Sequence, residues 1–166
     1  MKNIHQKFRQ FLSEAPRASY IEDGMIRLYH YTKPNKEDIV LDPKYKKSYY
    51  SRNEFETATT PRTFFYVDPS QKESFFGLAN LYTTQVPASQ VYDFTVDPEG
   101  FKDKIRHPVY GLRKGEEWDE LMETIREEYG GIFYSTANFD VVAWFYPIEV
   151  ERVPEDEKRR LEDPER

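Results

Sequence analysis

The sequence contains no cysteine. This absence excludes disulfide bonds, thiol catalysis and structural zinc sites built on cysteine. Histidine is scarce, and no pair of histidines has the HxH or HExxH spacing of a metal site, so the sequence predicts none. The three histidines are His5, His30 and His107.

Long apolar runs are also missing. No run approaches the roughly 20 residues that cross a bilayer, and the N-terminus lacks the apolar region of a signal peptide. We therefore expect no membrane partner, and a protein that is cytoplasmic or packaged in a particle.

Several common enzyme motifs are absent. The sequence has no G-x-G-x-x-G, no Walker loop and no G-x-S-x-G, which removes the main support for phosphate-loop enzymes and α/β hydrolases. A formal net charge of -6 weighs against a general nucleic-acid-binding surface, although a local basic patch is compatible with it.

Aromatic residues, in contrast, are abundant. The 166 residues include 13 Tyr and 12 Phe against only 3 Met, so aromatic rings must supply much of the core volume. Many of these rings carry a hydroxyl group, which suits a polar ligand as well as a core.

The length fits one domain, which we expect to span residues 17–151. Residues 1–16 are predicted to form a short amphipathic helix. Within them, Phe11-Leu12-Ser13-Glu14-Ala15 is similar to the Leu-x-Glu sites at which proteases of tailed phages trim packaged proteins. This helix is therefore a candidate for removal, whereas the charged residues 152–166 are predicted to be a disordered tail or a loose helix.

Residues 27–32 predict a strand, because β-branched and aromatic residues favour a pleated, half-buried surface. Side chains alternate along a strand, so Leu28, His30 and Thr32 share one face. The opposite face carries Arg27, Tyr29 and Tyr31. By itself this pattern favours a core histidine at position 30.

The remaining pattern predicts an α+β fold. Strands are expected over residues 63–67, 91–96, 132–135 and 141–145. Helices are expected over residues 71–82 and 116–129, and a long loop over 33–62. Turn signals are Asp23-Gly24 before the first strand and Gly130-Gly131, which we expect to cap the second helix in the left-handed conformation.

Three short patches of sequence follow one another in a set order. A His-x-Thr strand comes first, then an aromatic strand with a helix ending Ala79-Asn80-Leu81-Tyr82, and finally the turn Asn138-Phe139-Asp140 before an apolar strand. From roughly His30 to Val150, this order resembles the ADP-ribosyltransferase fold of diphtheria toxin and the poly(ADP-ribose) polymerases. The resemblance implies split β-sheets with flanking helices.

The resemblance also implies that NAD is the substrate and that no metal is needed. In such enzymes a histidine and a hydroxyl two residues later orient the ribose and nicotinamide, which here would be His30 and Thr32. Rings from the aromatic strand and its helix would enclose the nicotinamide, with Phe65, Tyr66 and Tyr82 as candidates.

Two positions depart from the family's His-Tyr-Glu triad. The closest register puts Phe65 at the tyrosine position, and phenylalanine stacks but cannot hydrogen-bond. Asp140 stands where the family uses the longer glutamate. The resemblance implies that His30 and Asp140 are catalytic, with the Asp140 carboxylate stabilising the ribosyl cation that forms as nicotinamide leaves.

The residues alone leave a plainer interpretation open at each site. Asp140 is equally a turn aspartate that satisfies nearby N–H groups. Tyr66 and Tyr82 are equally core residues.

The leading hypothesis is an NAD-dependent ADP-ribosyltransferase, a glycosyltransferase that acts on a protein or nucleic-acid acceptor. The changes at Phe65 and Asp140 favour a second hypothesis, a catalytically inactive, packaged or structural phage protein that retains the fold and contacts capsid components. A third hypothesis, an RNA-modifying relative that acts on phosphorylated ends, requires a basic pocket.

Overall fold

The computed structural model describes residues 17–32, 39–43, 60–71, 79–101, 103, 116–135 and 138–165. The predicted N-terminal helix with its Leu-x-Glu site, and most of the predicted loop and first helix, lie outside these residues.

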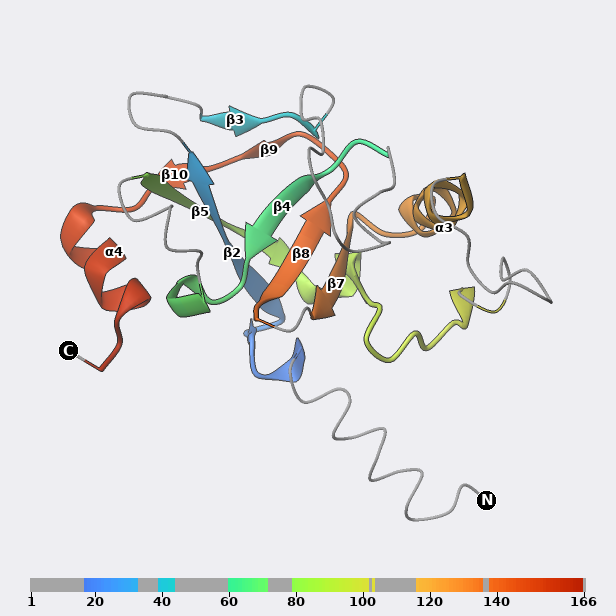
Figure 1. The fold of residues 1–166 in the computed structure, drawn as a ribbon, viewed down its shortest axis with the longest axis horizontal. Helices are drawn as coiled ribbons and strands as arrows, with labels where there is room; N and C mark the ends of the chain where they lie inside the picture. Colours follow the sequence, from blue (N-terminus) through green and yellow to red (C-terminus); the bar gives the residue numbers. More distant parts are fainter. Residues whose placement is uncertain are drawn as a thin grey trace, which may run out of the picture.

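The described residues form a mixed α+β structure that is mostly sheet (Figure 1). The main sheet has eight strands in the order β10-β5-β2-β4-β8-β7-β6, and β1 pairs with β2. Strands β3 and β9 form a separate pair. The strands are β1 (Ile21–Glu22), β2 (Met25–Thr32), β3 (Val40–Leu41), β4 (Thr63–Tyr66), β5 (Asn80–Pro87), β6 (Val91–Asp93), β7 (Gly131–Ser135), β8 (Asp140–Trp144), β9 (Ile148–Glu149) and β10 (Glu151–Arg152). The helices are α3 (Glu116–Arg126), α4 (Glu155–Glu162) and the short 3-10 turns η3 (Pro69–Gln71) and η5 (Ala88–Gln90).

The strand predicted at residues 27–32 is confirmed as β2. The turn before it is also confirmed: Asp23 and Gly24 have φ angles of 53° and 74° and join β1 to β2. Two successive residues with positive φ are typical of a hairpin turn whose twist matches that of the strands. Strand β2 then pairs antiparallel with β5 along its whole length, from Met25 to Thr32.

Side-chain alternation along β2 separates two parts of the core. Leu28 packs with Phe65 and Val142, whereas Tyr29 and Tyr31 pack with Leu81 in another cluster. The predicted face assignment of these residues is therefore confirmed.

Helix α3 confirms the predicted amphipathic helix and supplies much of the third core cluster. Leu121, Met122 and Ile125 are fully buried against Ile132 and Tyr134 of β7. Each such side chain contributes roughly 1.5–3 kcal/mol relative to an exposed position. These contacts fix the helix at one end of the sheet, beside β7 (Figure 1).

The predicted left-handed glycine cap of this helix is wrong. Gly130 and Gly131 do not have positive φ angles. A Cβ atom would come within 2.5 Å of the Trp144 ring at Gly130 and within 2.7 Å of it at Gly131. The close approach of the Trp144 ring thus leaves no room for a larger side chain at either glycine.

The helix predicted over residues 71–82 is wrong at its C-terminal end. Ala79 precedes β5, and Asn80, Leu81 and Tyr82 are its first residues. The continuous pairing with β2 outweighs a helical apolar stripe, because propensity yields to tertiary pairing.

Two further segments differ from their prediction. The strand predicted over residues 91–96 ends at Asp93, after which the chain turns. The charged tail forms the regular helix α4, which packs Leu161 near Tyr31 and Val153. None of the described helices is long and apolar enough to cross a membrane.

Candidate functional site

An aromatic cavity of about 200 Å³ lies beside the junction of β2 and β4, and residues of β7 and β8 also line it. Its lining residues are His30, Tyr31, Phe64, Phe65, Tyr66, Tyr134, Phe139 and Val141. An apolar cavity of about 150 Å³ is known to hold one benzene molecule. The aromatic cavity therefore has room for about one ring, with the rest of a larger ligand outside it.

The strand pairing explains why a cavity forms here. Strands β2 and β4 share the single register pair Tyr29 and Tyr66, although β4 pairs with β8 along its full length from Thr63 to Tyr66. The two strands therefore separate beyond that pair, and side chains rather than backbone bonds fill the gap.

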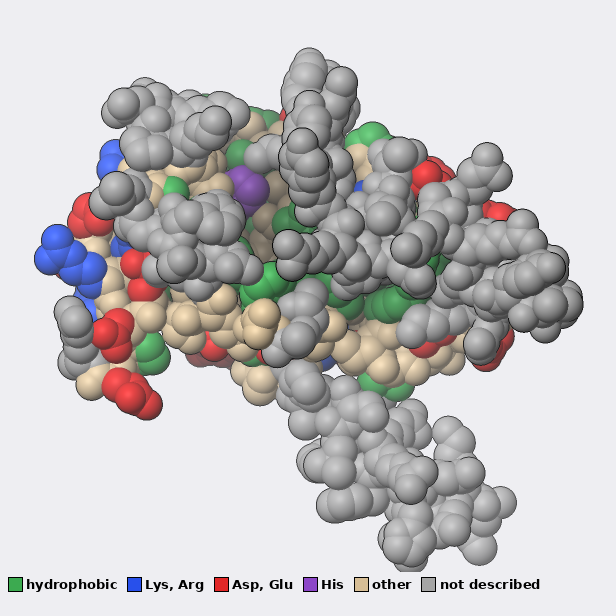
Figure 2. All heavy atoms as spheres, in the orientation of Figure 1, with side chains coloured by type: hydrophobic (Ala, Val, Ile, Leu, Met, Phe, Trp, Pro, Cys, Tyr) green, Lys and Arg blue, Asp and Glu red, His purple; other side chains and the backbone are tan. Residues whose placement is uncertain are grey.

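His30 bridges the gap between the two strands. Its Nδ1 atom lies 2.7 Å from the Phe64 carbonyl oxygen, and its ring centroid lies 5.5 Å from that of Phe65. A carbonyl only accepts hydrogen bonds, so Nδ1 carries the proton and Nε2 is the acceptor nitrogen of the neutral ring. His30 is half-buried and is the only histidine among the described residues. Figure 2 shows histidine side-chain atoms, in purple, at the molecular surface.

Two of the cavity's tyrosines, Tyr31 and Tyr66, are in edge-on contact with neighbouring rings. The Tyr66 ring lies 5.9 Å from that of Tyr31 and 5.7 Å from that of Phe139, with interplanar angles of 79° and 77°. The Tyr31 hydroxyl donates to Glu162 Oε2 at 2.6 Å, which attaches α4 to the cavity wall. Burial, and then this hydrogen bond, raise the pKa of Tyr31 well above its usual value, so the hydroxyl stays protonated at neutral pH.

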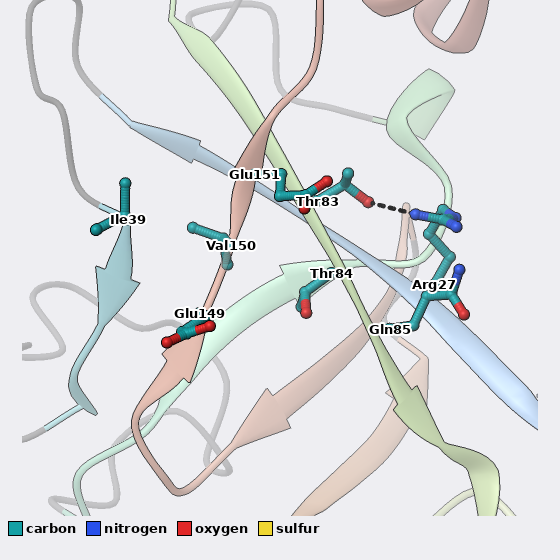
Figure 3. A pocket seen from close by; sticks show the side chains of 8 residues that line it. All are labelled: Arg27, Ile39, Thr83, Thr84, Gln85, Glu149, Val150 and Glu151. Carbon is teal, nitrogen blue, oxygen red and sulfur yellow. Dashed lines mark hydrogen bonds between the residues drawn. The ribbon is translucent and has the colours of Figure 1, made fainter.

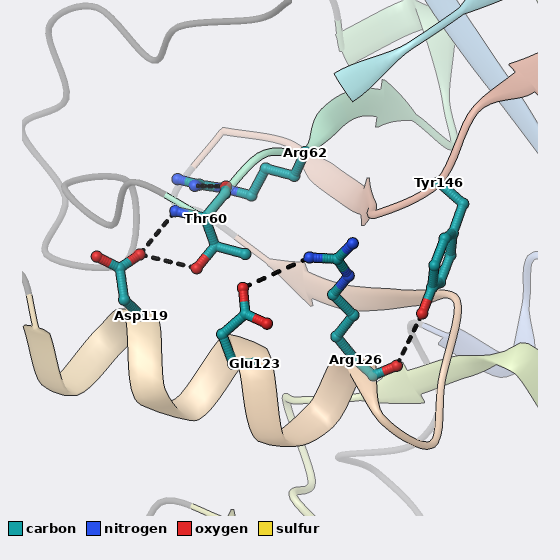
Figure 4. A network of polar contacts seen from close by, with 6 residues as sticks. All are labelled: Thr60, Arg62, Asp119, Glu123, Arg126 and Tyr146. Carbon is teal, nitrogen blue, oxygen red and sulfur yellow. Dashed lines mark hydrogen bonds and ion pairs between the residues drawn. The ribbon is translucent and has the colours of Figure 1, made fainter. Parts of the chain in front are cut away.

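A buried arginine supports the outer wall. Arg62 is 4% exposed, its guanidinium lies 5.0 Å above the Phe64 ring, and its Nη1 donates to the Thr60 carbonyl at 2.8 Å. Thr60 in turn donates from N–H and Oγ1 to Asp119 of α3 at 2.7 and 2.8 Å (Figure 4). This network connects the start of β4 to helix α3 and places Phe64.

Thr32 and Tyr82 do not line the cavity. Tyr82 is 4% exposed, pairs with His30 in the β2–β5 register and packs in the same cluster as Phe65. Thr32 is buried and pairs with Asn80 at the end of β2. The structure thus places both residues next to His30 in the sheet, outside the aromatic cavity.

Asp140 also lies outside the cavity, although its neighbours Phe139 and Val141 line it. Its carboxylate accepts hydrogen bonds from the Tyr20 hydroxyl at 2.6 Å, Ser135 Oγ at 2.6 Å and Gln71 Nε2 at 3.4 Å. Its own N–H donates to Gln71 Oε1 at 2.8 Å.

The environment of Asp140 also acts on Tyr20. Burial, followed by the hydrogen bond to Asp140, raises the pKa of Tyr20 well above its usual value. Through side-chain hydroxyl and amide groups, the Asp140 carboxylate thus joins two segments that are distant in the chain, at Tyr20 and Gln71, and the neighbouring strand β7 at Ser135.

Of the six residues predicted for the site, the structure brings His30, Phe65 and Tyr66 together at the cavity. Tyr31, Phe64, Tyr134 and Phe139 line it as well and were not predicted for the site. The sequence signal for them was the high aromatic content, which does not say which rings meet. Among the described residues, no group of three or more His, Asp or Glu could hold a metal ion.

The described residues thus form an α+β structure with an aromatic cavity of about the size of one ring. Comparison with protein-family descriptions, curated proteins and solved structures finds no significant match.

Proposed function

We propose that this domain is of the ADP-ribosyltransferase type, binds the nicotinamide end of NAD in the aromatic cavity and transfers ADP-ribose to a protein or nucleic-acid acceptor. The observation that supports the proposal is the cavity beside His30, on the strand where the sequence resemblance expects nicotinamide to bind.

The chemistry of the cavity suits a nicotinamide ring. The nicotinamide of NAD is planar and carries a positive charge while it is bonded to ribose. Aromatic faces and edges attract planar rings, and tyrosine and phenylalanine faces attract cations. The rings of Tyr66 and Phe139 would contact nicotinamide directly, and His30 would orient it from the side of β2.

The proposed reaction breaks the bond between the nicotinamide nitrogen and ribose C1′. The electron pair of that bond leaves with nicotinamide, the acceptor's nucleophile bonds to C1′, and the acceptor's proton passes to solvent. A cavity that holds nicotinamide favours this step by keeping the leaving group in line with the scissile bond.

Asp140 contributes to this reaction only under one condition. The condition is that its carboxylate exchanges a hydrogen bond from Tyr20 or Ser135 for one from a ribose bound at the cavity. We therefore assign binding to the aromatic residues and His30. The electrostatic role of Asp140 is tested by measuring ADP-ribose transfer: Asp140→Ala should abolish transfer while leaving the fold intact, and an active variant would remove Asp140 from the mechanism.

Calorimetric titration of NAD and of free nicotinamide tests the proposal. The full chain should bind both, and Phe139→Ala should weaken both by roughly tenfold, because a lost ring contact is worth about 0.5–1.5 kcal/mol beyond area burial. Tyr146→Ala is the matched control, since Tyr146 is an exposed aromatic residue that does not line the cavity. Absence of binding at millimolar NAD, with or without residues 1–14, contradicts the proposal.

A second candidate is a packaged or structural phage protein that retains the fold without catalysis. Two observations favour it: the hydrogen-bonded Asp140 carboxylate and the phenylalanine at position 65. Mass spectrometry of protein taken from particles tests the packaging. An N-terminus at Ala15 supports this candidate, and an intact Met1 argues against processing.

A further inference from the structure

A second cavity, of about 540 Å³, lies between β5 and β9, beside the pair that β10 forms with β5 (Figure 3). Its walls include Arg27 of β2, Thr83 and Gln85 of β5, and Glu149, Val150 and Glu151 around β9 and β10. Among the described residues, none lines both cavities. The volume falls within the roughly 300–1,000 Å³ typical of sites for small ligands.

One wall of this cleft is an open part of the β5 edge. Strand β10 pairs with β5 at Tyr82 and Thr83. The Val153 N–H donates to the Leu81 carbonyl at 2.8 Å, so Leu81 presents its backbone groups towards β10. Backbone groups alternate in direction along a strand, so those of Thr83 and Gln85 face the same side. Gln85 lies beyond the β10 pairing, and its backbone faces the cleft.

The opposite wall is β9, which pairs with a different strand. The Val150 N–H donates to the Ile39 carbonyl at 2.8 Å, beside the β3–β9 pair. By the same alternation, the backbone groups of Glu149 point away from β3 and towards β5. Among the described residues, Glu149 and Gln85 thus face each other without forming a strand pair.

The cleft carries opposite charges on its two sides. Arg27 is the register partner of Gln85 and lies on the β2 side, whereas Glu149 and Glu151 lie on the far side (Figure 3). Within the described chain, Arg27 forms no ion pair with either glutamate, and its hydrogen bond to Thr83 Oγ1 is long, at 3.4 Å. The cleft is therefore dipolar, and the backbone groups of Gln85 and Glu149 face it.

We propose that this cleft binds an extended peptide that carries a basic side chain and, two residues further on, an acidic side chain. The basic group contacts Glu149 and Glu151, and the acidic group contacts Arg27. Residues i and i+2 of an extended chain project from one face about 7 Å apart, so one face of the peptide presents both charges to the cleft. The peptide's amide groups complete the hydrogen bonds of the Gln85 and Glu149 backbone.

Calorimetry with blocked tripeptides tests this proposal on the full chain without NAD. The probes are acetylated and amidated Arg-Ala-Glu, Arg-Ala-Gln, Gln-Ala-Glu and Gln-Ala-Gln. Arg-Ala-Glu should bind most tightly, and removal of each charge should weaken binding by up to roughly fivefold, the range of partly exposed ion pairs. The preference should shrink as ionic strength rises.

Two variants assign the binding to the cleft. The double change Glu149→Gln and Glu151→Gln should remove the preference for the basic side chain, and Arg27→Gln should remove the preference for the acidic one. Glu120→Gln, which changes an exposed carboxylate on α3, should alter neither preference. Circular dichroism confirms that each variant is folded.

Three results overturn the proposal: no peptide binds at millimolar concentration, the neutral peptide binds as tightly as the dipolar one, or the cleft variants keep both preferences. Arg27, Glu149 and Glu151, the residues changed here, do not line the aromatic cavity, so NAD titration of the same variants keeps this outcome separate from that of the proposed function.

Discussion

At the scale of single residues, Asp140 shows most clearly what the sequence could not reveal. Its partners Tyr20 and Gln71 lie 120 and 69 positions away in the chain. A local pattern predicts a turn aspartate here but cannot identify partners that only the folded sheet brings near. In the structure the donors to the Asp140 carboxylate are side chains, whereas the sequence suggested backbone N–H groups as donors.

Replacement of Tyr20 tests this network. Tyr20→Phe removes one donor to Asp140 and should lower the free energy of unfolding by about 1 kcal/mol or more, since a hydrogen bond to a charged group is worth about 1.5–3 kcal/mol. Urea denaturation measures the change. Tyr146→Phe is the matched control, because it removes an exposed hydroxyl that donates to the Arg126 carbonyl at 3.1 Å. Equal effects of the two changes would contradict the role given to Tyr20.

His30 was predictable in part. Alternation along the strand correctly placed it with Leu28, opposite Tyr29 and Tyr31. The same rule separated His30 from Tyr31, yet both line the cavity. The reason is the separation of β2 from β4, which opens the space between the strands to side chains of both faces.

At the scale of elements, local patterns predicted β2 and α3 well, because each has one periodicity and clear ends. Strand β5 was hidden by a helical stripe that overlaps its first residues. Its identity depends on pairing with β2 from Met25↔Pro87 to Thr32↔Asn80, which is a long-range property. The helix predicted to place Tyr82 at the site is replaced by a strand that places Tyr82 beside His30.

The attachment of α3 to β4 gives a second test. Asp119→Ala removes the acceptor for both the N–H and the Oγ1 of Thr60, which is 5% exposed. We expect a loss of about 1–3 kcal/mol in the free energy of unfolding, the cost of leaving buried donors unpaired.

A neighbouring glutamate on the same helix provides the control for this test. Glu123→Ala breaks only the exposed pair with Arg126 at 3.5 Å and should cost less than about 0.5 kcal/mol. If Asp119→Ala is as mild as Glu123→Ala in chemical denaturation, the network does not anchor the helix.

At the scale of the whole molecule, the sequence predicted the α+β class but not the order of the strands. Strand order follows from pairings such as β4 with β8, whose partners Thr63 and Trp144 lie far apart in the chain. The charged tail illustrates the same limit. Its composition suggested a disordered tail or a loose helix, but the Tyr31 to Glu162 hydrogen bond shows that α4 packs on the domain.

The raised pKa values of four tyrosines predict how the stability of the fold changes at alkaline pH. The hydrogen bond to Glu99, followed by burial, raises the pKa of Tyr129 to about 12, and the pKa values of Tyr20, Tyr31 and Tyr92 are also raised. In the unfolded chain these hydroxyls ionise near pH 10. Between pH 10 and 12 the folded state therefore binds more protons than the unfolded state, so stability falls as pH rises.

Thermal unfolding between pH 8 and 11.5 measures this effect. Below pH 9 these hydroxyls should have little effect on the melting temperature. Above pH 10 the melting temperature should fall. Tyr129→Phe should make the fall less steep because one raised group is removed. A melting temperature that stays constant up to pH 11.5 would show that these hydroxyls ionise equally easily in both states.

The central claim is that the aromatic cavity binds the nicotinamide end of NAD. The most direct measurement is the NMR spectrum of protein labelled with ¹³C at histidine, with the His30 signal assigned by His30→Gln. Titration with NAD should shift the His30 ring signals, because the ligand's ring lies beside that histidine, and Phe139→Ala should reduce the shift at equal NAD concentration. An unmoved His30 signal at saturating NAD would contradict the account.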